Sequence, residues 1–90
     1  MITVPAFPAI VTMTDDIRPV AQDLLQRRVD GQLSLTVPDV LQVIYEHQTE
    51  AGFTPDAMSR LMTYCQQLVL CEALPYAKQL AATYNLTINV

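Results

Sequence analysis

Apolar residues recur at helical spacing in four stretches of the chain. In residues 16–29 they fall on one stripe, and charged and amide side chains occupy the opposite face, which is the pattern of an amphipathic helix. The stripe consists of Ile17, Val20, Ala21, Leu24, Leu25 and Val29. Gly31 follows at the position where helices commonly end on a glycine. The pattern therefore predicts a first helix over residues 16–29.

Threonines mark the starts of the next two predicted helices. Thr36 precedes Asp39 by three residues, a capping box in its shorter acidic form, and Thr54 is followed by Pro55 at the first helical position. The second helix extends to near residue 50, with a buried stripe of Val37, Val40, Leu41 and Ile44. The third has a buried stripe of Met58, Leu61, Met62, Cys65, Leu68 and Val69, opposite Ser59, Thr63, Gln66 and Gln67. Because residues 68–71 are apolar all round, we expect that end to be fully enclosed and the third helix to be the central one.

The fourth predicted helix opens at Pro75 and extends to about Tyr84, where Asn85 can end it in the left-handed conformation. Residues 2–4 and 86–90 alternate with period two, which predicts a short strand at each end. The expected fold class is all-α: a single small four-helix domain of residues 1–90, with a short two-stranded pairing of the N- and C-termini as a candidate addition. It comprises an apolar extended arm at 1–14, a helical core at 15–84 and a short extended tail at 85–90.

Charge and cysteine content extend the analysis from the fold to its surroundings. Charged residues make up 16% of the chain, against about 25% in an average soluble domain, so part of the surface is expected to be covered by a partner. A net charge of −4 with five scattered basic residues disfavours nucleic acid and anionic membranes as partners. The N-terminal stretch lacks the basic segment of a signal peptide, and Cys65 and Cys71 are too far apart on a helix to bridge. We therefore expect a cytoplasmic protein.

The residues offer little catalytic chemistry. The two glycines both fall at helix boundaries, and a single histidine cannot assemble the usual zinc sites within one chain. We therefore predict no catalytic residue, no cofactor and no metal. His47 is the candidate to weigh, because Glu50 at i+3 can orient it as a general base. We interpret His47 as a polar residue at a helix edge and keep an enzyme that uses it as the third hypothesis.

One segment carries a resemblance to a known family. Residues 51–61, Ala-Gly-Phe-Thr-Pro-Asp-Ala-Met-Ser-Arg-Leu, resemble the turn and recognition helix of LacI-type helix-turn-helix repressors. Those families place Ala-Gly, a hydrophobic residue and Ser or Thr at the helix start, then an apolar-Ser-Arg-apolar run one turn later. The resemblance implies a DNA-binding transcriptional regulator in which Thr54, Pro55, Asp56 and Arg60 approach the groove or backbone. The charge balance makes this the second hypothesis.

Both ends of the chain are uncharged, since all the charged residues lie between Asp15 and Lys78. Apolar side chains there are costly to leave in water, at roughly 25 cal/mol per Å². The leading hypothesis is a small acidic, non-catalytic protein–protein interaction or assembly protein that acts through an apolar, weakly charged surface. We expect a homodimer with the termini in or beside the interface. The interface candidates are Ile2, Val4, Phe7, Ile10, Val11, Leu86, Ile88 and Val90.

Overall fold

The computed structural model describes residues 10–32, 35–51, 53–71 and 74–89, with the side chains at 49–51 excepted. Four helices follow in order within these residues: α1 (Arg18–Val29), α2 (Val37–Ala51), α3 (Pro55–Val69) and α4 (Leu74–Tyr84). The predicted all-α class with four helices is confirmed, and the predicted boundaries agree to within about two residues, the usual uncertainty of helix ends.

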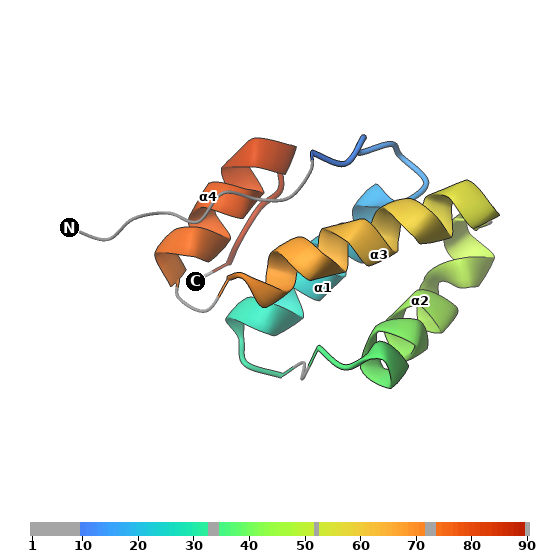
Figure 1. Ribbon diagram of the computed structural model, residues 1–90, viewed down its shortest axis with the longest axis horizontal. Helices are drawn as coiled ribbons and strands as arrows, with labels where there is room; N and C mark the ends of the chain where they lie inside the picture. Colours follow the sequence, from blue (N-terminus) through green and yellow to red (C-terminus); the bar gives the residue numbers. More distant parts are fainter. Residues whose placement is uncertain (1–9, 33–34, 52, 72–73, 90) are drawn as a thin grey trace.

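The core is built around α1 and α3. In Figure 1, α3 crosses the middle of the molecule with α1 behind it, and α4 and α2 lie on opposite sides. α1 packs against each of the other three helices, and α3 packs against α4 as well. Fully buried side chains of α1 and α3 therefore fill the centre, namely Val20, Ala21, Leu24, Leu25, Ala57, Leu61, Tyr64 and Leu68. The third helix was expected to be the central one; in the structure, α3 and α1 are both central.

The helix ends form as the local sequence predicts. The hydroxyl of Thr54 accepts a hydrogen bond from the N–H of Ala57 at 3.1 Å, and the hydroxyl of Thr36 accepts a longer one from the N–H of Asp39 at 3.4 Å. The Thr36 hydroxyl also donates to the Asp39 carboxylate at 2.7 Å. Each hydroxyl satisfies an N–H that has no partner within its own helix.

Two helices end on residues in the left-handed conformation. Gly31 follows α1 with φ 73°, and the N–H of Gln32 donates to the carbonyl of Arg27 at 2.9 Å. Asn85 follows α4 with φ 57°, and the next N–H along the chain donates to the carbonyl of Ala81 at 2.8 Å. Both are Schellman-type ends, so the predicted roles of Gly31 and Asn85 are confirmed.

Replacing Thr54 with alanine is expected to lower the free energy of unfolding by about 1 kcal/mol, because the N–H of Ala57 loses its acceptor. Urea denaturation followed by circular dichroism measures the change. Thr83→Ala is the matched control, because its exposed hydroxyl only donates back to the carbonyl of Gln79 within α4. Equal midpoints for Thr54→Ala and the parent would contradict the cap.

The predicted phase of α3 is wrong at its C-terminal end. The pattern predicts Gln67 on the solvent face, but its side chain is fully buried. The pattern also predicts Val69 in the buried stripe, but Val69 is 52% exposed, so residues 68–71 are not enclosed all round. The reason is that α3 packs against both α1 and α4, which buries two faces of the helix instead of one stripe.

A hydroxyl from α4 satisfies the side-chain oxygen of the buried Gln67, whereas its Nε2 has no hydrogen-bond partner among the described residues. Tyr84 donates its hydroxyl to Oε1 of Gln67 at 2.6 Å, and the same hydroxyl accepts the N–H of Val11 at 2.9 Å. The Tyr84 ring also meets Tyr64 edge to face, with 5.5 Å between ring centroids. This chain of contacts ties α3, α4 and the segment before α1 into one polar bridge inside the core.

The predicted pairing of the termini as two short strands is not seen. Residues 86–89 form no strand, and the other half of the predicted pair, residues 2–4, lies outside the described residues. After α4, the C-terminal residues run back beside that helix (Figure 1). Side chains of α1 bond to their main chain.

Candidate interaction surface

A row of large apolar side chains lies exposed along α2. Val37, Leu41 and Tyr45 are 57%, 46% and 65% exposed. They stand at i, i+4 and i+8, so they share one face of the helix over about 12 Å of its length. We call these three residues the α2 stripe. Exposed apolar side chains gathered on one face, in contrast to scattered ones, are typical of an interaction site.

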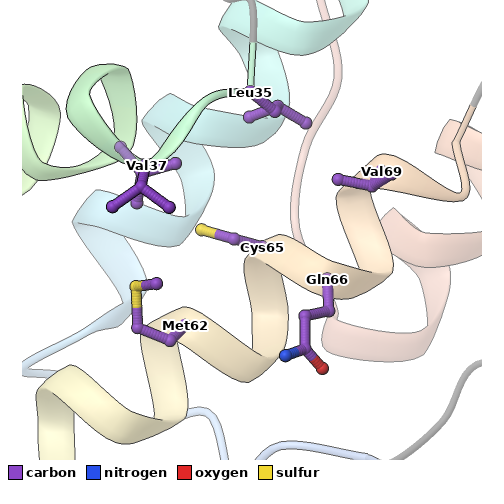
Figure 2. A pocket seen from close by; sticks show the side chains of 7 residues that line it. Leu35, Val37, Met62, Cys65, Gln66 and Val69 are labelled. Carbon is purple, nitrogen blue, oxygen red and sulfur yellow. The ribbon is translucent and has the colours of Figure 1, made fainter.

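An apolar groove adjoins one end of the α2 stripe. It has a volume of about 200 Å³ and is lined by Leu35, Val37, Val40, Met62, Cys65, Gln66 and Val69. Figure 2 shows Leu35 and Val37 on one wall and α3 on the other, with the Cys65 sulfur directed between them. The Gln66 amide points away from the opposite wall, so the facing walls present carbon and sulfur atoms.

Two polar side chains of α2, Glu46 and His47, are engaged by α1. Glu46 accepts a hydrogen bond from Arg27 at 3.1 Å, and His47 Nε2 lies 2.8 Å from the Asp23 carboxylate. Burial works to raise the pKa of Asp23, but the hydrogen bonds from His47 and Arg27 outweigh it and hold that pKa below its ordinary value. These ionic contacts bind α2 to α1 and leave the α2 stripe uncharged.

The hypothesis that His47 acts as a general base relied on Glu50, whose side chain lies outside the described part of the structure. In the structure, His47 lies against Asp23 of α1. This contact explains the position of the ring through packing of α2 on α1, without reference to a substrate.

The two cysteines are buried and unpaired. Burial raises the pKa of Cys65 to about 12 and raises that of Cys71 as well. The thiolate is the reactive form of cysteine, so neither thiol is activated as a nucleophile. Their contribution is apolar packing, and Cys65 also forms part of the groove.

Three of the four residues that the repressor resemblance assigns to DNA contact other residues of the same chain. Thr54 caps α3, and Asp56 accepts a hydrogen bond from Arg60 at 2.9 Å. The Arg60 guanidinium also donates to the Thr14 hydroxyl at 2.6 Å and lies 3.5 Å from the Asp16 carboxylate. Arg60 therefore holds the segment before α1 onto α3. Pro55 is exposed at the start of α3.

The terminal interface candidates occupy different environments. Ile10 is exposed, Val11 is buried, and Leu86 and Ile88 are partly buried against the chain's own core. Ile2, Val4, Phe7 and Val90 lie outside the described residues. Among the described candidates, Val11, Leu86 and Ile88 are therefore covered, at least in part, by their own chain, where a second copy was expected to cover them.

The α2 stripe differs from the sequence prediction, in which Val37 and Leu41 belong to the buried face of the second helix. A signal was present: residues 37, 40, 41, 43, 44 and 45 are all apolar, which is a wider arc than one neighbouring helix can cover. The structure buries Val40, Val43 and Ile44 and leaves the other three to solvent.

In comparisons with known proteins, no protein-family model, no curated protein and no solved structure matches this chain. Among the described residues, no group of three or more His, Cys, Asp or Glu side chains could hold a metal ion. The helices of that same part of the chain are too short or too polar for any to cross a membrane.

Proposed function

We propose that this chain is a small non-catalytic interaction protein that forms a homodimer through the α2 stripe. The observation that carries the proposal is the uncharged row of Val37, Leu41 and Tyr45 beside an apolar groove. A copy of the chain is the partner because the stripe can face itself about a two-fold axis. Each copy carries net charge −4, which opposes association elsewhere on the surface, but two copies can meet at a face that presents no charge.

The stripe is suited to pairing with itself about a two-fold axis. If the axis passes beside Leu41, two antiparallel α2 helices place Tyr45 of one copy opposite Val37 of the other. Val37 lines the groove, so the tyrosine ring meets the opening of the groove on the second copy. An apolar cavity of about 150 Å³ holds a benzene ring, so a groove of about 200 Å³ can accept a tyrosine ring.

The two other hypotheses from the sequence draw less support. Arg60 is bonded to Asp56 and Thr14 of its own chain, which leaves the DNA-binding hypothesis without its main cation. An enzyme that uses His47 draws no support from the buried, weakly acidic thiols. Neither hypothesis accounts for the α2 stripe.

Replacing Leu41 with aspartate is expected to weaken dimerisation on the order of 100-fold. The change brings a carboxylate from each copy to the two-fold axis, and burying an unpaired charge costs roughly 3 kcal/mol or more. Sedimentation equilibrium over a range of concentrations measures the dissociation constant, and circular dichroism verifies that the helices remain.

Leu74→Asp is the matched control for that experiment. Leu74 is 42% exposed, close to the 46% of Leu41, but it lies on α4 and away from the stripe. Its replacement is expected to leave the dissociation constant unchanged. A parent chain that stays monomeric at high micromolar concentration, or a Leu41→Asp chain that dimerises as tightly as the parent, would refute the proposal.

A further inference from the structure

A second surface, on α1, binds a stretch of extended main chain. The N–H of Thr87 donates to Oε1 of Gln22 at 2.9 Å, and Nε2 of Gln22 donates back to the carbonyl of Thr87. Gln26 makes the same pair of bonds to Asn89, at 3.0 Å from the N–H and 3.4 Å to the carbonyl. Arg18, one turn earlier on α1, donates to the carbonyl of Tyr84 at 3.2 Å.

The spacing of these bonds follows from the geometry of a helix and a strand. Residues four apart on a helix are about 6 Å apart along its axis, and residues two apart on an extended chain are about 6.6 Å apart. A glutamine side chain carries the same donor and acceptor as a peptide group. Gln22 and Gln26 therefore present to the C-terminal residues what the edge of a β-strand would present.

The contacts distinguish between positions along the extended segment. The side chains of Thr87 and Asn89 are exposed, whereas Leu86 and Ile88 are partly buried against the core. Main-chain bonds with apolar contacts at alternate positions are the recognition mode of strand addition, in which the peptide backbone provides affinity and alternate side chains provide specificity. The surface accepts an extended segment with apolar residues at two alternate positions.

The hydrogen bonds that hold the resident segment to Gln22 and Gln26 are weak. Its four bonds to Gln22 and Gln26 are exposed to solvent, and each exposed bond adds little net stability. Asn85 joins the segment to α4 in the left-handed conformation, outside any helix. Solvent-exposed hydrogen bonds outside the core helices open at low cost in free energy, and the partly buried Leu86 and Ile88 are the remaining contacts to be released.

We propose that Gln22 and Gln26 form a binding site for an extended peptide of another polypeptide, with apolar residues at alternate positions. Residues 86–89 occupy the site in the same chain and mimic that ligand. The site is separate from the α2 stripe and does not depend on the homodimer.

The test uses the full chain with Thr87→Pro and Asn89→Pro, which removes both N–H donors of the resident segment while leaving the site itself unchanged. The probe is a fluorescein-labelled peptide of residues 85–89, with fluorescence anisotropy as the measurement. The proline chain is expected to bind it at least about tenfold more tightly than the parent, where the resident segment competes. Adding Gln22→Glu and Gln26→Glu should reverse this gain, since a carboxylate cannot donate to the peptide carbonyls, whereas adding Gln79→Glu on α4 should not.

A proline chain that keeps the parent's helical circular dichroism and binds no better than the parent would overturn the proposal. If that chain loses its helices, amide hydrogen exchange on the parent decides. Excess unlabelled peptide is expected to displace the resident segment and to speed the exchange of the Thr87 and Asn89 amides. Unchanged exchange of both amides at millimolar peptide would also overturn it.

Discussion

Replacing Leu68 with alanine is expected to lower the free energy of unfolding by about 2–5 kcal/mol. Leu68 is fully buried in α3, which packs against both α1 and α4. Its removal forfeits apolar burial and leaves a cavity that a closely packed core cannot fully close. Domains have a total stability of about 5–15 kcal/mol, so this change is a large part of the whole. Urea denaturation followed by circular dichroism measures it.

Val69→Ala is the control for that measurement, because the two residues are neighbours in the same helix. Val69 is 52% exposed, so its loss is expected to cost less than about 1 kcal/mol. The sequence pattern alone predicts that both positions are buried and that both changes are costly. A cost at Val69 equal to that at Leu68 would show that the helix is rotated from the phase described above.

Replacing Gln67 with alanine is expected to lower the free energy of unfolding by about 2–3 kcal/mol. The change leaves a cavity in the core, and it removes the acceptor of the Tyr84 hydroxyl, whose oxygen also holds the N–H of Val11. A buried donor left without its acceptor costs about 1–3 kcal/mol. Thermal and urea denaturation of the parent and variant measure the loss.

Gln66→Ala is the matched control, since Gln66 is exposed on the same helix and is one residue away. Its replacement is expected to change stability by less than about 0.5 kcal/mol. Equal effects at positions 66 and 67 would contradict the polar bridge between α3 and α4.

The helices and their ends were predictable because their causes are local. Thr54 caps α3 through an amide three residues away, and Gly31 and Asn85 end their helices by adopting φ values that few other residues tolerate. Such interactions involve residues within one turn, so the order of residues along the chain contains all the information they need.

The faces of α3 were not predictable in the same way, because they depend on contacts between distant residues. Gln67 is buried because α3 packs against α4 as well as α1, and its side-chain oxygen accepts a hydrogen bond from Tyr84, seventeen residues away. Periodicity alone assigns a glutamine to solvent, and no local feature of α3 reveals the hydroxyl. The binding of the C-terminal residues by Gln22 and Gln26 was not predictable from the sequence for the same reason, because about 65 residues separate the partners.

The sequence predicted that an apolar interaction surface exists, but not where it lies. The low charge content predicted that a partner covers part of the chain. The termini were predicted to be that part because they carry no charged residue. In the structure, Val11, Leu86 and Ile88 pack against the core of their own chain. The structure leaves Leu41 and Tyr45 exposed instead, because α2 carries more apolar residues than its contact with α1 can bury.

The most direct test of the α2 dimer is a disulfide across its two-fold axis, formed by a Leu41→Cys chain under mild oxidation. Helices that pack about 8–10 Å apart bring facing Cα atoms to within about 6 Å, inside the range that a disulfide spans. The native thiols are buried with raised pKa values, so they compete poorly, and Leu74→Cys on α4 provides the exposed control. We predict rapid, nearly complete cross-linked dimer for Leu41→Cys and little for Leu74→Cys on a non-reducing gel. Equal and slow cross-linking of the two variants would contradict an interface formed by α2.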